Sequence, residues 1–333
     1  SKRYLVTGCA GFIGSKVAEL LLDAGHLVVG VDSVNDAYDP RLKQWRVDRL
    51  LDRSEFRFQQ LDITDFQAME KLYASDGKKS SQPPFSAVIN LAARAGVRAS
   101  VEDPWVYYRA NCEGTLNLLE LCRRYGVKKF VLASTSSLYG AHNPVPYRED
   151  ADTNRPLSPY AASKKAAEAT AYTYHHLHGI DVTVFRYFTV YGPAGRPDMS
   201  VFRFVRRIAE GESIVVFGDG TQQRDFTYVD DVARGTVAGL APLGYDVINL
   251  GGDRPVRLST IIDQIGRLVG REPVIDYQPA HPADVDATWA DVGRAQNLLG
   301  WSPQVSIEEG LHRSVEWYRE NREMVLPLEL GDR

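Results

Sequence analysis

The chain has 333 residues, of which 44% are hydrophobic and 25% charged. This mixture is ordinary for one large or about two globular domains and excludes disordered, collagen-like and disulfide-scaffold chains. Lysine and arginine total 39 against 43 aspartates and glutamates, a formal net charge of −4, which argues against nucleic acid or an anionic membrane as the main partner.

Three cysteines, Cys9, Cys112 and Cys122, are odd in number and lack C-x-x-C spacing, which favours a reducing, cytoplasmic compartment. Residues 1–7 lead directly into a strand-like run without the apolar region of a signal peptide. No apolar stretch approaches the roughly 20 residues needed to cross a bilayer. We therefore expect a protein that is neither secreted nor bound in a membrane, and we expect no bound metal.

The first half of the chain alternates β-branched runs with segments of helical periodicity, which is typical of βαβ units in a parallel sheet covered on both faces. Strands are predicted at residues 3–7, 27–32, 55–60, 87–91, 129–133 and 181–186. Helices are predicted at residues 12–25, 65–74, 105–125 and 160–178. The pattern predicts an α/β fold with a doubly wound sheet of about six strands.

The pattern changes toward the C-terminus. Residues 78–84 are polar and contain prolines, so we expect a surface loop there. The later elements predicted are a helix near 200–210, strands near 214–217 and 247–250, and helices near 259–270 and 307–321. We expect a first domain at 1–191 and a smaller α/β lobe at 192–333, with the chain crossing between them near 225–255.

Gly8, Gly11 and Gly14 lie between the first predicted strand and helix. Glycine lets the backbone turn tightly there and lets a pyrophosphate approach the helix N-terminus. The spacing G-x-x-G-x-x-G matches the common dinucleotide fingerprint only partly. Asp32 ends the second strand, where a carboxylate binds an adenosine ribose and repels a 2′-phosphate, which favours NAD over NADP. The alternative is a tight turn in a protein without a cofactor.

Tyr160 and Lys164 are four residues apart at the start of a strongly helical segment, so both lie on one helix face. An ammonium beside a phenol favours the phenolate, which can act as a general base. Tyr125 and Lys129 have the same spacing, but Gly126 interrupts that pair and a structural role is preferred for it.

Hydroxyl side chains follow the strand predicted at 129–133, namely Thr135, Ser136 and Ser137. Ligands of open α/β folds bind at this carboxyl edge of the sheet, and hydroxyls there can donate to a substrate oxygen. The alternative is a Ser/Thr-rich turn that satisfies its own backbone.

These segments resemble the extended short-chain dehydrogenases/reductases that act on nucleotide sugars. The resemblance covers nearly the whole chain and rests on residues 7–14 (TGCAGFIG), 62–63 (DI), 91–93 (LAA), 134–140 (STSSLYG) and 160–164 (YAASK). It implies a Rossmann-type fold in which Tyr160 is the base, Lys164 its electrostatic partner and Thr135 a ligand of the reacting hydroxyl. It implies NAD as the cofactor, bound by Gly8, Gly11, Phe12, Ile13, Gly14, Asp32, Asp62, Ile63, Leu91, Ala92, Ala93, Tyr160 and Lys164.

The C-terminal part is similar to the same family. Residues 217–226 (FGDGTQQRDF) match the segment whose arginine contacts the nucleotide diphosphate, which implies that role for Arg224. A forked, permanently charged guanidinium suits phosphate. Asp284 matches the carboxylate near the uridine ribose. His281 departs from the pattern, because several members have a phosphate-binding arginine there.

Particular positions separate the reactions of the family. Dehydratases carry an Asp-Glu pair where this chain has Ser136 and Ser137. Decarboxylases of UDP-glucuronate carry glutamate at the position of Ser137. Hexose epimerases and decarboxylases alike usually carry asparagine at the position of Thr189. Residues 36–40, 92–98, 186–193 and 195–199 are most similar to the UDP-glucuronate 4-epimerases. The resemblance implies that Ser136, Ser137 and Thr189 bind the sugar and that Arg196 binds its carboxylate, although Arg196 could equally form a loop salt bridge.

The expected activity is therefore NAD-dependent 4-epimerisation of UDP-glucuronate to UDP-galacturonate through a 4-keto intermediate, without decarboxylation. The alternatives are a UDP-glucose or UDP-hexose 4-epimerase, a UDP-glucuronate decarboxylase and a non-catalytic NAD-binding regulator. A UDP-sugar is the expected partner, with no nucleic acid or membrane. The resemblance also implies a homodimer that pairs the helices predicted at 105–125 and 160–178.

Overall fold

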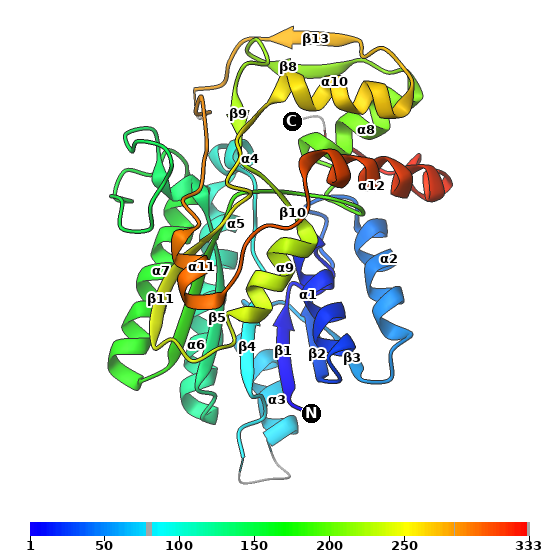
Figure 1. Cartoon of the computed structure of the whole chain (residues 1–333). Coiled ribbons are helices and arrows are strands. Elements are labelled where there is room, and N and C mark those ends of the chain that lie inside the picture. Colours follow the sequence, from blue (N-terminus) through cyan, green and yellow to red (C-terminus); the bar gives the residue numbers. More distant parts are fainter. Residues whose placement is uncertain (78–81, 283, 332–333) are drawn as a thin grey trace.

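The main sheet of the computed structural model, which describes residues 1–77, 82–282 and 284–331, consists of seven parallel strands (Figure 1). From one edge to the other they are β11 (Tyr245–Leu250), β6 (Asp181–Tyr187), β5 (Lys129–Thr135), β4 (Ala87–Asn90), β1 (Arg3–Thr7), β2 (Leu27–Asp32) and β3 (Phe56–Gln60). The predicted doubly wound α/β fold is confirmed. The loop predicted at 78–84 lies largely outside the described residues.

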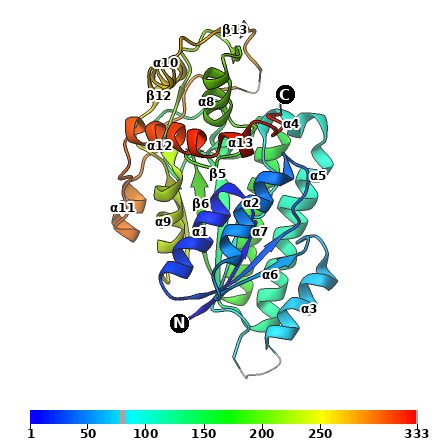
Figure 2. The same cartoon turned by 90° about the vertical axis from the view of Figure 1, so that its right-hand side faces the viewer.

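Helices cover both faces of this sheet (Figure 1, Figure 2). On one face lie α1 (Phe12–Asp23), α2 (Pro40–Leu51), α9 (Val229–Ala238) and α11 (Gly293–Leu299). On the other face lie α3 (Phe66–Gly77), α6 (Gly114–Tyr125) and α7 (Pro159–His178). Because both faces are covered, the central strands are apolar and buried at nearly every position, as in β5, where every residue is buried.

The sheet has one strand more than predicted. The strand predicted near 247–250 was grouped with the C-terminal lobe, but β11 pairs in parallel with β6 and belongs to the main sheet. The hydrogen bonds between strands determine the sheet to which a strand belongs. The position of a short apolar run in the sequence does not show which strand it pairs with. The division of the chain at residues 191 and 192 stays a prediction.

The single helix predicted at 105–125 is interrupted. It consists of α5 (Pro104–Tyr108), a π-helical turn η1 (Arg109–Glu113) and α6. Within the π-turn, the side-chain amide of Asn111 donates to the carbonyl of Arg94 at 3.0 Å and to Oγ of Ser163 at 2.9 Å. The turn thus ties the segment after β4 to α7, and π-turns occur often at functional sites.

The C-terminal lobe lies above the carboxyl edge of the sheet (Figure 1). Its core is formed by the apolar faces of the helices and a parallel strand pair, which are α8 (Ser200–Glu210), β8 (Ile214–Phe217), α10 (Leu258–Val269), β13 (Ile275–Gln278), α12 (Ile307–Glu320) and α13 (Arg322–Val325). The remaining short elements pair at the junction or flank the site: α4 (Val97–Glu102), η2 (Ser136–Tyr139), β7 (Thr189–Tyr191), β9 (Gln223–Arg224), β10 (Phe226–Tyr228) and β12 (Val256–Arg257).

Candidate active site

The glycine-rich turn between β1 and α1 is packed too closely for side chains. Gly8 has φ +70°, and a Cβ added there would lie 2.7 Å from the backbone nitrogen of Ala92. A Cβ on Gly14 would lie 2.0 Å from the carbonyl oxygen of Gly8. The turn therefore leaves the N-terminus of α1 open to an anionic ligand, as a pyrophosphate requires.

The carboxylate of Asp32 holds this turn from the end of β2. Its two oxygens accept from the backbone N–H of Ala10 at 3.0 Å and of Val34 at 2.8 Å. Every residue that the sequence predicts for cofactor binding lines the same cleft, namely Gly8, Gly11, Phe12, Ile13, Gly14, Asp32, Asp62, Ile63, Leu91, Ala92, Ala93, Tyr160 and Lys164. The cradle without side chains and the strand-end carboxylate fit NAD.

Lys43 is a cation in this cleft that sequence reasoning missed. Its side chain is buried, and Nζ donates to the carbonyl of Asn35 at 2.8 Å and to its side-chain oxygen at 2.9 Å. Burial lowers the pKa of Lys43 to about 8, and the nearby guanidinium of Arg46 acts in the same direction while Asp32 opposes them. A buried ammonium adds positive potential where the cofactor's phosphates are expected.

The hydroxyl of Thr135 links β5 to the catalytic tyrosine predicted from the sequence. Thr135 accepts from the backbone N–H of Ser137 at 3.1 Å and caps η2, which leaves its own hydrogen for the phenol oxygen of Tyr160. Burial raises the pKa of Tyr160, whereas the hydrogen bond from Thr135 and the charge of Arg196 lower it. We expected the ammonium of Lys164 to lower the pKa of Tyr160, but the structure shows this effect from Thr135 and Arg196 instead.

Helix α7 carries both Tyr160 and Lys164 in its first turns because its start is well defined. Ser158 caps the helix by accepting from the backbone N–H of Ala161 at 3.1 Å, and Pro159 occupies the first position. Lys164 is buried, and burial lowers its pKa to about 8, although the carboxylate of Glu168 opposes the shift.

The burial of Lys164 predicts that its replacement stabilises the fold. A folded-state pKa of about 8 against about 10.4 in the unfolded chain means that the buried charge costs about 3 kcal/mol below pH 8, and that the cost disappears as pH rises toward 10.4. Lys164→Met should therefore raise the free energy of unfolding by about this amount at pH 7. Urea unfolding at pH 7 and pH 10.5, with matched NAD content, measures it; an equal gain at both values would contradict the argument.

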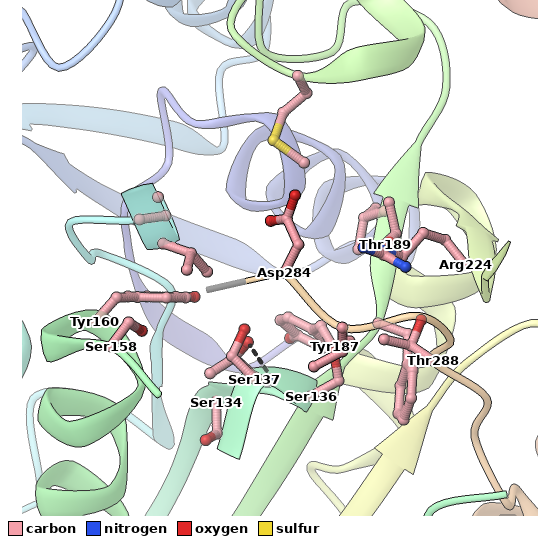
Figure 3. Close-up of a pocket in the computed structure, with 18 of the residues that line it drawn as sticks. Ser134, Ser136, Ser137, Ser158, Tyr160, Tyr187, Thr189, Arg224, Asp284 and Thr288 are labelled. Carbon is pink, nitrogen blue, oxygen red and sulfur yellow. Dashed lines mark hydrogen bonds between the residues drawn. The ribbon is translucent and has the colours of Figure 1, made fainter. Parts of the chain in front are cut away.

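A second pocket opens beside the cofactor cleft and shares Tyr160 and Arg196 with it. All residues predicted to bind substrate line this pocket, namely Ser136, Ser137, Thr189, Arg196, Arg224 and Asp284. Figure 3 shows Tyr160 entering from the side of α7 and Arg224 on the opposite side, with the serines of η2 between them. The phenol and the guanidinium therefore stand on opposite sides of the pocket.

Arg196 forms the loop salt bridge left open by the sequence and also lines the pocket. Its Nε donates to Oδ1 of Asp198 at 3.0 Å, and its Nη2 bonds to Oδ2. Burial acts to lower the pKa of Arg196, but Asp198 outweighs it and raises that pKa. The buried guanidinium of Arg46 donates to the carbonyls of Ala194 and Gly195, at 2.7 and 3.1 Å from Nη2, and so fixes the loop that carries Arg196.

Arg224 and Asp284 meet at the junction of the two lobes. Arg224 lies in β9, which pairs antiparallel with β12. Burial lowers the pKa of its guanidinium, and the carboxylate of Asp284 opposes this shift. The Asp284 carboxylate accepts from Nη2 of Arg98 at 2.7 Å. His281 is not among the residues that line the two pockets described above.

Several pocket residues carried no motif that could have identified them. Tyr147 and Leu157 come from the long connection between η2 and α7, and Thr288 follows Asp284 in an irregular segment. Tyr147 stacks on Tyr139 with ring centroids 4.7 Å apart, which fixes one wall of the pocket. Other lining residues, such as Val97, Tyr187 and Met199, lie in segments on which the family resemblance rests.

None of the helices described is both long and apolar enough to cross a membrane. In the same part of the chain, no three His, Cys, Asp or Glu side chains are grouped so that they could hold a metal ion.

A doubly wound fold in which a glycine-rich turn, a tyrosine and a lysine line one cleft is that of a short-chain dehydrogenase/reductase. The chain belongs to the NAD dependent epimerase/dehydratase family, whose model matches residues 4–251. It is 57% identical to a UDP-glucuronate 4-epimerase of Thermodesulfobacterium geofontis over 323 residues, which are 97% of this chain and 98% of that protein.

Solved structures show the same relationship. The UDP-glucuronic acid 4-epimerase of Bacillus cereus, in complex with UDP-glucuronic acid and NAD, is 36% identical with a TM-score of 0.88 over 96% of this chain and 99% of that one. The UDP-glucose 4-epimerase of Thermotoga maritima, with UDP-glucose, is 34% identical with a TM-score of 0.86 and covers 96% of this chain and 99% of its own.

Proposed function

We propose that this protein is an NAD-dependent epimerase that interconverts UDP-glucuronate and UDP-galacturonate by inverting C4 of the sugar. The observation that carries the proposal is the polar cluster of Ser137, Thr189 and Arg196 in the same pocket as Tyr160. A guanidinium with neighbouring hydroxyls suits the C5 carboxylate of a uronate, whereas a neutral hexose has no use for the charge.

The chain's own residues supply the proton chemistry. When bound, NAD⁺ takes up the C4 hydride of the sugar and later returns it. Tyr160 accepts the proton of the C4 hydroxyl, and Thr135, which already hydrogen-bonds the phenol, holds the reacting oxygen. The charge of Arg196 lowers the pKa of Tyr160 and so favours the phenolate, and Lys164 lies buried in the adjoining cofactor cleft.

Inversion requires the sugar to present its other face while the nucleotide stays bound. Arg224 lies across the pocket from Tyr160, with Asp284 between them in this view (Figure 3), and these two residues bind the diphosphate and the uridine ribose. With that end fixed, the 4-keto sugar can rotate about its diphosphate linkage and take the hydride back on the opposite face, as the proton returns from Tyr160.

The 4-keto intermediate of a uronate is a β-keto acid, which loses CO₂ when the bond to the carboxylate stands perpendicular to the carbonyl plane. Ser136, Ser137 and Thr189 hold the carboxylate by hydrogen bonds, and Arg196 by charge, in an orientation that does not allow this alignment. The chain has serine where the decarboxylases carry glutamate, which also favours epimerisation.

A proton NMR time course with UDP-glucuronate and no added NAD tests the proposal. We expect UDP-galacturonate to appear, because the cofactor is regenerated at each turnover. A UDP-pentose with CO₂ would identify a decarboxylase instead. Conversion of UDP-glucose but not UDP-glucuronate would refute the carboxylate argument, and NAD binding without turnover of either sugar would indicate a regulator.

We also propose that the protein is a cytoplasmic homodimer formed by the outer sides of α5, α6 and α7. Trp105, Leu116, Tyr172 and Leu177 are apolar there and 73, 43, 51 and 64% exposed, and an apolar face of this kind is typical of an interface. The three cysteines are unpaired, which is consistent with a reducing compartment.

Leu116→Asp should therefore weaken the dimer at least about 10-fold, because it buries a charge in the interface. Leu298→Asp is the matched control, since Leu298 is 41% exposed on α11, away from this face. Sedimentation of both variants measures the effect. Equal behaviour of the two variants, or a monomeric parent protein, would contradict the assignment.

A further inference from the structure

Arg98 crosses the cleft between the two parts of the molecule. It belongs to α4, the first element after the strand β4 of the main sheet, yet its side chain contacts Asp284 and Phe217 of the C-terminal lobe. Its Nη2 donates to Oδ2 of Asp284 at 2.7 Å, and its guanidinium carbon lies 4.0 Å from the ring centroid of Phe217. The carboxylate and the ring thus fix the guanidinium in position and plane.

The charges around Arg98 are arranged for an anion. Arg98 lies close enough to Arg224 to lower the pKa of that guanidinium, in the same direction as burial. The Asp284 carboxylate pairs with Arg98 and also acts on Arg224, on which Asp286 acts more weakly. The side chains of Arg98 and Asp284 are each 29% exposed, so the pair borders the cleft and is open to a ligand.

We propose that Arg98 binds the diphosphate of the nucleotide sugar together with Arg224. This inference rests on the proposed function in taking a UDP-sugar as the ligand. A planar guanidinium binds phosphate oxygens through two parallel N–H donors, and a diphosphate carries enough negative charge to engage two arginines. When Arg98 turns to the phosphate, the Asp284 carboxylate is left free to accept hydrogen bonds from ribose hydroxyls.

A purely structural role for Arg98 makes a different prediction. If the Arg98–Asp284 pair only held the lobe against the sheet, its loss would weaken every ligand of the cleft equally. A phosphate ligand discriminates, because uridine and UDP share the base and ribose and differ only in the diphosphate. Comparison of these two probes therefore separates the roles without requiring turnover.

The variants are Arg98→Met, which removes the charge, and Arg98→Lys, which keeps it but removes the fork. Arg124→Met is the matched control, because Arg124 pairs with Glu70 at 3.1 Å and lies 4.9 Å over the ring of Phe66. This pair is similar in geometry but lies outside the cleft. Affinities for UDP and uridine are measured by calorimetry or by competition on the holoprotein.

We expect Arg98→Met to weaken UDP binding about 10- to 100-fold and uridine binding less than about 3-fold, with Arg98→Lys intermediate for UDP and Arg124→Met unchanged. Unchanged UDP affinity, or an equal loss for UDP and uridine, would overturn the proposal. If UDP binding falls as expected but UDP-glucuronate is not epimerised by the parent protein, the proposed activity fails and the phosphate site stands.

Discussion

Tyr160→Phe should abolish epimerisation, with a loss in kcat of about 10³-fold or more, because removal of the phenol oxygen eliminates the general base. Binding of NAD and UDP should stay within a few-fold of the parent, since the backbone of α7 and the ring position are retained. Steady-state kinetics with UDP-glucuronate and titration with UDP measure the two quantities. The loss should therefore fall on kcat rather than on affinity.

Tyr125→Phe is the control for this experiment. Tyr125 and Lys129 have the same four-residue spacing, but Tyr125 packs at the end of α6 and Lys129 pairs with Asp181 and with the hydroxyl of Thr183. The control should keep full activity. If Tyr160→Phe lost NAD binding together with activity, the tyrosine would be a binding group and the catalytic assignment would be wrong.

Arg196→Met should change the choice of substrate. We expect kcat/KM for UDP-glucuronate to fall about 10²-fold, because a charge-assisted contact to the carboxylate is lost in a partly buried site. Binding of UDP, which lacks a carboxylate, should change little. Kinetics with UDP-glucuronate and UDP titration measure both effects.

Asp198→Asn tests whether Arg196 acts as a pre-oriented ligand. Asp198 occupies the Nε and Nη2 side of the guanidinium, so the opposite side remains for a substrate carboxylate. The variant should have a smaller effect than Arg196→Met and in the same direction. An unchanged kcat/KM for UDP-glucuronate in Arg196→Met would contradict the carboxylate role and leave Arg196 as a loop salt bridge alone.

The local signals in the sequence identified most of the elements that carry the site. The glycine-rich turn after β1 and the capped start of α7 depend on neighbouring residues, so Gly8, Tyr160 and Lys164 could be placed from the sequence. The same holds for Thr135, because the end of a buried strand fixes the sheet edge at which it lies. The family resemblance supplied Arg224 and Asp284, which no periodicity could have assigned.

Other features depend on contacts between distant segments. Helix α2 was not predicted, although Asp39 caps it and Pro40 begins it, because many of its residues are charged and its apolar positions are few. The π-turn around Asn111 requires knowledge of its partners Arg94 and Ser163. Lys43 and Arg98 acquire their surroundings only when α2, α4 and the lobe meet in space.

The most direct test of the central claim uses UDP-glucuronate carrying deuterium at C4 with the holoprotein. The proposed mechanism moves this label to the cofactor and back to the same carbon, so UDP-galacturonate should retain deuterium at C4 and its carboxylate should stay intact. Proton NMR and mass spectrometry measure both properties in one sample. A product whose label has exchanged with solvent, or a pentose that has lost CO₂, would contradict the account.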